Sequence, residues 1–284
     1  MPKKWFFILL IGFFGFTFIP PSVEIPLYAT ELATANACSI QNSAFKGGEE
    51  VTYKVYYNWG IIWLSAGEVV FRVKDEGNQY HFSVVGTTYK SYEWFFKVRD
   101  YYDSWVDKKT LLPSVSIRDV HEGKYTLYDK NTFNRRNNTV HNLRGRAIDR
   151  LKEDNLFEVE PCLHDMLSII YYARNLDFED IDEGDQFPVK LFVDKETWPL
   201  NITFEGREKA IKVKGQGYFN ALKFSPEVIE GNVFPGDATL HVWATDDNNR
   251  IPLIIESPVS VGSVKAILKD YKGLRYDMQA RTIK

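Results

Sequence analysis

The stretch from Val51 to Trp59 carries an apolar or aromatic side chain at every odd position. Because successive side chains of a strand point to opposite faces of a sheet, this period of two predicts a β-strand with one buried face. The same alternation returns at 69–73, 80–84 and 264–268. A chain built from such segments has to bury one face of an extended sheet, which constrains its fold more than any other feature.

Composition and turn signals support a fold rich in β-structure. The 284 residues include 20 Phe, 16 Tyr and 7 Trp but only 3 Met, and aromatic residues favour strands. Turn signals such as 75–78, 122–123 and 246–249 separate about a dozen predicted strands. We therefore predict a mainly β protein whose antiparallel strands form a curved sheet, a barrel or a sandwich. Residues 134–158 are polar, and we expect them to form an exposed hairpin and loop.

One segment, residues 162–175, departs from the period of two. Its apolar residues recur at intervals of three and four, as on one face of an amphipathic helix. They are Leu163, Met166, Leu167, Ile170 and Tyr171. Pro161, directly before this segment, is a common start signal, so we predict a single helix near 162–175.

The N-terminus has the organisation of a secretory signal peptide. Lys3 and Lys4 form a short basic region before an apolar run at 5–19. This run is shorter than the roughly 20 residues that a membrane-spanning helix needs. No second apolar run of spanning length follows, so we expect no transmembrane span after processing.

Small residues further along mark the predicted cleavage site. Ala35 and Ala37 both fit the position before a signal-peptidase cut. We therefore predict a signal peptide at 1–37 and a single β-rich domain at 38–284, located in the periplasm. The domain contains no Pro/Gly-rich linker and no repeat that would divide it.

Cys38 and Cys162 are the only two cysteines. In an exported chain they can form one disulfide, and closing so long a loop contributes roughly 4–5 kcal/mol in the loop-entropy treatment. Two alternatives stay open. Both thiols can remain free, or Cys38 can be the lipidated first residue of a bacterial lipoprotein, which the lipid anchors to a membrane.

The charge balance and the histidines exclude some classes of function. The chain has 35 Lys+Arg and 38 Asp+Glu, a formal net charge of −3, which gives no electrostatic surface for duplex nucleic acid. The 5 His are scattered and form neither HxH nor HExxH, so we predict no metal site and no cofactor.

Several ordered segments resemble the domain-of-unknown-function 3108 family, most closely its versions from Bacteroidetes-type bacteria. They are Phe45–Tyr53, Ser65–Glu68, Phe96–Asp100, Asp165–Arg174 and Val242–Asp247 with Pro252. No single motif is specific, but the ordered set extends from about Ala44 to Lys272. The resemblance implies a secreted, β-rich periplasmic protein. It implies no established activity and carries over no catalytic residues.

Two aromatic clusters lie where the strand pattern is interrupted, and we predict that they bind a ligand. Aromatic side chains at strand ends can line the mouth of a barrel or the lip of a groove. The candidates are Trp59, Trp63, Trp94, Phe95 and Phe96, with Arg99 as a polar anchor. Packing in the core is the alternative for each aromatic residue.

Three hypotheses about function follow from these patterns. The first is a non-enzymatic envelope protein that binds a lipid or other hydrophobic ligand, or an envelope protein partner. The second is a periplasmic hydrolase with a site assembled from dispersed Asp, His and Arg residues, although no nucleophile elbow is present. The third is a structural assembly factor without a ligand. A pocket with strongly perturbed titratable groups would favour the enzyme, and a mostly apolar cavity would favour the binding protein.

The predicted disulfide can be tested directly on the exported protein. Mass spectrometry after digestion under non-reducing conditions should find Cys38 and Cys162 in one linked pair of peptides. Recovery of both cysteines as free, alkylated thiols would contradict the prediction.

Overall fold

The computed structural model describes most of the chain. It covers residues 38, 40–59, 62–94, 96–229, 239–258 and 262–284. The predicted signal peptide at 1–37 lies outside these residues. In the described part, all strands belong to one 16-stranded sheet that accompanies a short α-helix, which confirms the mainly β fold class.

The strands vary widely in length. Their bounds are β1 (Glu50–Trp59), β2 (Ile62–Glu76), β3 (Gln79–Thr88), β4 (Arg99–Asp107), β5 (Pro113–Glu122), β6 (Tyr125–Asn134), β7 (Thr139–Gly145), β8 (Leu151–Glu158), β9 (Leu163–His164), β10 (Gln186–Val193), β11 (Glu196–Val213), β12 (Gly217–Pro226), β13 (His241–Thr245), β14 (Pro252–Pro258), β15 (Ser263–Lys272) and β16 (Arg281–Thr282). The helix is α2 (Ser168–Ala173), and a 3-10 turn, η2 (Lys90–Tyr92), follows β3.

Most neighbours in the chain are also neighbours in the sheet. The order is β8-β7-β6-β5-β4-β3-β2-β1-β15-β14-β13-β12-β11-β10-β9, and β16 pairs with β12 outside this path. The pairs along the path are antiparallel except β9 with β10, which are parallel. Tight turns make this meander possible, because Gly77 and Gly123 supply the positive φ angles of 70° and 59° that hairpins require.

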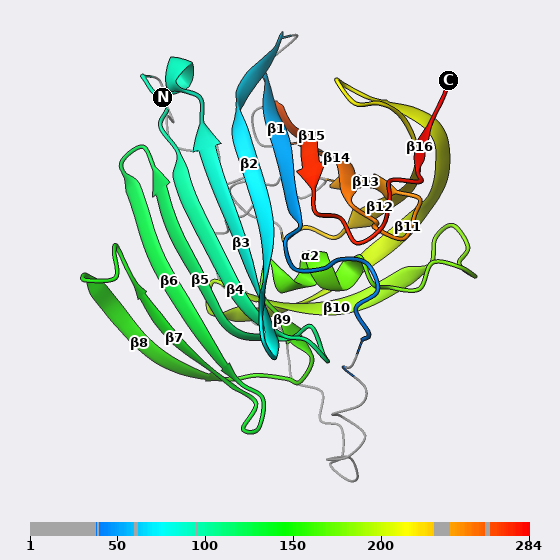
Figure 1. The fold of residues 1–284 in the computed structure, drawn as a ribbon. Helices are drawn as coiled ribbons and strands as arrows, with labels where there is room; N and C mark the ends of the chain where they lie inside the picture. Colours follow the sequence, from blue (N-terminus) through cyan, green and yellow to red (C-terminus); the bar gives the residue numbers. More distant parts are fainter. Residues whose placement is uncertain (1–37, 39, 60–61, 95, 230–238, 259–261) are drawn as a thin grey trace.

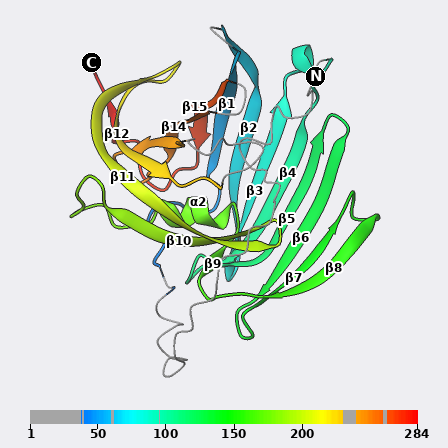
Figure 2. The same cartoon turned by 180° about the vertical axis from the view of Figure 1, so that it is seen from behind.

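The sheet bends around α2, so that its two ends approach each other (Figures 1 and 2). The hydrogen-bonded path stops at β8 and β9, and the sheet is therefore a curved, open structure rather than a closed barrel. Side chains span the remaining distance. Val140 on β7 and Phe157 on β8 pack with Leu163 on β9 and Phe192 on β10.

The hairpin between β10 and β11 has a charged turn, which also contributes to the contact between the two ends of the sheet. The turn between β10 and β11 consists of Asp194 and Lys195, both at positive φ (51° and 73°), which costs a non-glycine residue roughly 1–2 kcal/mol. Asp194 accepts hydrogen bonds from Arg118 on β5 at 2.7 Å and from Arg144 on β7 at 2.8 Å. Arg118 is also paired with Asp129 at 2.6 Å, and all of these groups are largely buried. The ion pairs offset the backbone strain and hold the hairpin against the opposite end of the sheet.

A buried ion pair fixes the helix inside the fold. Arg174, directly after α2, donates to both carboxylate oxygens of Glu49, at 2.5 and 2.9 Å. It also donates from Nε to the carbonyl oxygen of Asn249 at 3.1 Å. All three residues are buried, so the end of the helix, the start of β1 and the turn before β14 are held in one geometry.

The predicted helix is present but shorter than the predicted range 162–175. Leu163 and His164 pair with β10 instead, and Asp165 accepts hydrogen bonds from the amides of Leu167 and Ser168, at 2.7 and 3.1 Å. This carboxylate therefore caps the start of the helix. The apolar residues spaced three and four apart therefore extend over β9 and the capping residues as well as over the helix.

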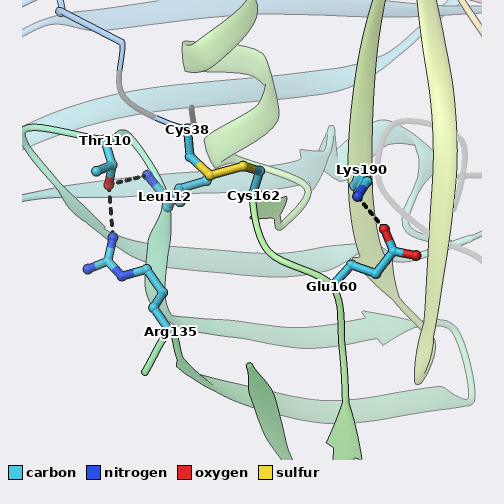
Figure 3. The surroundings of a disulfide bond; sticks show 7 residues. All are labelled: Cys38, Thr110, Leu112, Arg135, Glu160, Cys162 and Lys190. Carbon is cyan, nitrogen blue, oxygen red and sulfur yellow. Dashed lines mark hydrogen bonds and ion pairs between the residues drawn. A yellow bond between two sulfur atoms is a disulfide. The ribbon is translucent and has the colours of Figure 1, made fainter. Parts of the chain in front are cut away.

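The predicted disulfide joins Cys38 to Cys162 (Figure 3). The two Cα atoms lie 5.2 Å apart across a sequence separation of 124, so the bond attaches the start of the domain to the chain just before β9. A sulfur in a disulfide cannot also carry a lipid thioether. The bond and the lipid-anchor alternative at Cys38 therefore exclude each other.

Two segments contain more continuous strand structure than the sequence indicated. The polar region 134–158 contains β7 and β8, and Arg144 within it points to Asp194 rather than to solvent. Residues 196–213 form one long strand, β11, interrupted by register shifts near Gly206 and Ala210, both at positive φ. Such bulges let a long strand follow a strongly curved sheet.

Asp194→Asn should lower the free energy of unfolding by about 3 kcal/mol, because it leaves two buried arginines without a full counter-charge. Urea unfolding at neutral pH measures this. The matched control is Asp154→Asn on β8, whose carboxylate is 74% exposed and pairs with His141. This control should change stability by less than about 0.5 kcal/mol. Equal, small effects of both variants would show that the hairpin tip does not hold the sheet together.

Candidate functional site

An apolar cavity of about 290 Å³ lies between α2 and the C-terminal half of the sheet. One wall is the helix, with Ile169, Ile170 and Ala173. The opposite wall is formed by alternating residues of the strands. They are Val189, Leu191, Leu200, Ile202, Leu222, Phe224, Val242, Ala244, Pro252 and Ile255, with Val51 and Tyr53 of β1 and Phe71 of β2.

Three residues of β12, Leu222, Phe224 and Pro226, line the cavity in succession. Leu222 is paired with Ala244, and the next lining residue of this strand, Phe224, with Val242. Pro226 ends the strand beside Ile202 of β11. From Leu222 to Pro226 a strand advances roughly 13 Å at about 3.3 Å per residue.

Few polar groups reach the cavity. Glu49 and Arg174 line it as the buried ion pair described above, so their charges compensate each other. Arg250 lines it near the end of the helix, and Asn201 and Glu227 line it beyond Pro226. The lining of the cavity is therefore mostly apolar, with polar side chains at a few positions.

Within the described part of the chain, the guanidinium of Arg250 is held by backbone carbonyl groups at the end of the helix and not by a carboxylate. Its Nη1 donates to the carbonyl oxygen of Leu176 at 2.6 Å and to that of Arg174 at 3.3 Å. The guanidinium carbon lies 4.9 Å from the centre of the Phe178 ring. Burial lowers the pKa of Arg250, and the negative charges of Asp177 and Glu179 oppose that effect.

The aromatic residues predicted from the sequence lie elsewhere. Trp94 is 84% exposed, and Trp63 is 41% exposed with the ammonium of Lys265 5.0 Å from its ring centre. Phe96 packs against the main hydrophobic core. Arg99 forms an ion pair with Glu93 and donates to the backbone oxygens of Val98 and Thr88. None of these four lines the cavity.

The other two aromatic candidates cannot be located in the same way. Phe95 lies outside the described residues, and so does the side chain of Trp59. The structure therefore does not bring the six predicted residues together into one site, and their role in ligand binding stays a prediction.

The residues that do line the cavity gave a sequence signal of a different kind. Strands 199–205 and 217–224 alternate as ordinary core strands, and α2 carries apolar residues on more than one face, including Ile169 and Ala173. Periodicity identifies such residues as buried. It does not show whether the space between two buried faces is filled.

Two acidic residues are buried together outside this cavity. Asp100 on β4 accepts the amide N–H of His121 at 2.9 Å, whereas neither side-chain oxygen of Glu122 accepts a hydrogen bond from the described residues. Burial, and then the charge of Asp100, raise the pKa of Glu122 well above its ordinary range. Burial also raises the pKa of Asp100. A protonated Glu122 can donate its O–H to Asp100, which removes the unfavourable contact of two carboxylates.

A second buried polar group surrounds the start of the helix. Burial lowers the pKa of His164 to about 3, so this imidazole is neutral, and its Nδ1 lies 3.3 Å from the Ser168 hydroxyl. Asp165 is engaged by the helix amides and by the hydroxyl of Ser104. These residues cap a helix end, as expected from their position, and they do not open into the cavity.

The described residues contain no cluster of three or more His, Cys, Asp or Glu side chains that could hold a metal ion. Within the same residues, no helix has the length and hydrophobicity that crossing a membrane requires.

A long curved sheet wrapped around a short helix and an apolar interior defines a β-barrel-like protein. A similar arrangement is found in the crystal structure of a beta-barrel-like protein of domain of unknown function DUF1849 from Brucella abortus. The TM-score is 0.51 at 8% identity, and the match covers 81% of this chain and 98% of that one. A crystal structure of a "putative lipoprotein" from Parabacteroides distasonis ATCC 8503 matches with a TM-score of 0.28 and 12% identity, covering 82% and 100% of the two chains.

The chain belongs to the family described as "Protein of unknown function (DUF3108)". The family profile matches residues 52–269, which confirms the resemblance seen in the sequence motifs. None of the curated proteins matches the sequence.

The proton held by the buried acids makes stability depend on pH. Because the folded state binds a proton that the unfolded state releases above the ordinary pKa of glutamate, about 4.3, stability falls as pH rises. Glu122→Gln removes this penalty. The variant should therefore be more stable than the parent at about pH 8, and the difference should shrink toward about pH 5.

Urea unfolding at several pH values measures this difference. The control is Glu158→Gln at an exposed position of β8, which should leave the pH dependence unchanged. Parallel pH curves for Glu122→Gln and the parent would mean that Glu122 is ionised in the folded protein.

Proposed function

We propose that this protein is an exported, non-enzymatic binding protein that holds a hydrophobic or amphiphilic small molecule in the cavity beside α2. The observation that carries the proposal is the apolar cavity itself, of about 290 Å³, with few polar groups in its lining. Small-molecule sites have this character, and their volumes begin at about 300 Å³.

The physical argument starts from the cost of an unfilled apolar space. Side chains such as Ile202, Leu222 and Phe224 lose dispersion contacts where no atoms face them. Water gains little there because it finds few hydrogen-bond partners. An apolar ligand restores the contacts and removes its own apolar surface from water, so its binding is favourable.

Export to the periplasm is part of the proposal. The Cys38–Cys162 disulfide is typical of oxidising compartments, and the N-terminal 37 residues have the pattern of a signal peptide. The family has no assigned activity, so membership in it does not indicate which ligand this protein binds.

The geometry favours binding over the two alternatives from the sequence. A hydrolase needs an acid, a base or a nucleophile in the cavity, but Asp100, Glu122 and His164, whose pKa values are shifted, lie outside its lining. Among the acids that line the cavity, Glu49 is held in the ion pair with Arg174. An assembly factor without a ligand needs no internal cavity. The exposed Trp63 and Trp94 remain candidates for contact with a ligand or an envelope protein partner.

Filling the cavity should abolish binding without unfolding the protein. Ala244→Trp on β13 and Ala173→Phe on α2 enlarge side chains on opposite walls. Both should weaken the binding of an apolar fluorescent probe, N-phenyl-1-naphthylamine, by more than about tenfold, equivalent to about 1.4 kcal/mol. Titration of probe fluorescence measures the affinity.

The matched control is Leu156→Trp on β8, at a position that is 68% exposed. It should bind the probe as the parent does. Thermal unfolding of each variant shows whether the fold is kept. If the parent binds no probe, and native mass spectrometry of the exported protein finds no copurified ligand, the proposal is wrong.

A further inference from the structure

Arg250 brings a positive charge to the cavity without an acidic partner. Within the part of the chain that the structure describes, no carboxylate oxygen lies within ion-pair distance of its guanidinium. Its two hydrogen bonds, to Leu176 and Arg174, both use Nη1 and both end on carbonyl oxygens. A guanidinium has five N–H donors, so Nε and Nη2 keep donors that the described residues do not engage.

The neighbouring charges are already matched or exposed. Arg174 is neutralised by Glu49, and Asp246 is paired with Arg207 at 2.5 Å. Asp177 and Glu179 are exposed to solvent, where water screens their charge. The end of the cavity at Arg250 is therefore positive.

The opposite end of the cavity has the opposite character. Arg250 lies beside Ile251, whose carbonyl oxygen accepts the amide N–H of Thr245 and whose own amide donates to the Thr245 hydroxyl, so it belongs to the Leu222–Ala244 end of the cavity. Glu227 follows Pro226 at the other end, and its carboxylate accepts the amide N–H of Asn201 at 2.8 Å. A ligand that lies along β12 thus has an arginine at one end and a carboxylate roughly 13 Å away.

The position of Arg250 explains how an unpaired cation is tolerated. Its Nη1 bonds the carbonyl oxygen of Arg174, the C-cap of α2, and that of Leu176 in the turn that follows. This contact orients the side chain but leaves its charge uncompensated. An anion in a half-buried site of this kind gains a charge-assisted hydrogen bond, and such bonds are stronger than neutral ones.

Resting on the proposed function, we infer that the ligand is a single-chain anionic amphiphile whose acidic headgroup binds Arg250 and whose tail lies along β12 toward Pro226. The reverse orientation would place the apolar tail against the guanidinium of Arg250 and leave that charge without an anion. The apolar walls between the two ends accept the tail.

The test compares two ligands that differ only in the headgroup. Dodecanoate and 1-dodecanol displace the fluorescent probe from the parent protein, from Arg250→Gln and from Arg250→Lys. Dodecanoate should bind the parent about tenfold or more tighter than the alcohol, as expected for a hydrogen bond to a charged group. Arg250→Gln should remove this preference by weakening only dodecanoate, and Arg250→Lys should keep part of it.

The control for a lost positive charge is Arg72→Gln. Arg72 pairs with Glu50 on the surface of the sheet, with 45% of its side chain exposed, and it does not line the cavity. The variant should keep the parent's preference for dodecanoate.

The outcomes separate this inference from the proposed function. Equal affinity of the parent for the two ligands, or a preference for the alcohol, overturns the headgroup assignment while the cavity remains a binding site. A preference that survives in Arg250→Gln overturns it as well. If neither ligand displaces the probe and the probe itself does not bind, the proposed function fails first. If Arg250→Gln does not fold, equal affinity of the parent for the two ligands still overturns the assignment, and so does a preference in Arg250→Lys that is as large as the parent's.

Discussion

The buried ion pair between Glu49 and Arg174 is the interaction on which the interior depends. Both groups are almost inaccessible to water, and either charge alone would be strongly unfavourable there. The pair therefore admits only those arrangements in which the end of α2 meets the start of β1. That arrangement makes the helix one wall of the cavity. It also places the carbonyl groups after the helix where Arg250 can bond to them.

Much of the fold follows from local sequence patterns. Alternation from Val51 to Trp59 marks β1 correctly, and the turns at Gly77 and Gly123 are visible as glycines between alternating segments. The contact between the two ends of the sheet is not visible in this way. It depends on Asp194 and Lys195 adopting positive φ angles that neither residue prefers, and on Arg144 turning inward from a polar segment. Such features are stabilised by partners distant in sequence, which propensity cannot anticipate.

The candidate site was harder to predict than the fold. The sequence predicts Trp94 as a ligand-binding residue because it interrupts a strand pattern; the side chain is exposed and does not line the cavity, so its role stays a prediction. Arg174 falls within the predicted helix and Arg250 directly after the Asp246–Asn249 turn, and neither position indicates that an arginine is buried there. Their roles depend on their surroundings in the fold. Arg174 is buried against Glu49, and Arg250 bonds to carbonyl groups after the helix. Cysteine pairing was the exception, because two cysteines allow only one intrachain bond.

The pairing of β1 with β15 has a consequence for how the chain is made. Glu50 lies opposite Lys272, so the first strand of the domain finds one of its two partners only when almost the whole polypeptide is present. A protein that crosses a membrane N-terminus first would hold an unpaired β1 edge in the new compartment until synthesis ends. Contacts between residues so distant in sequence also form slowly. Until β15 is available there is a period in which the β1 edge needs protection from aggregation.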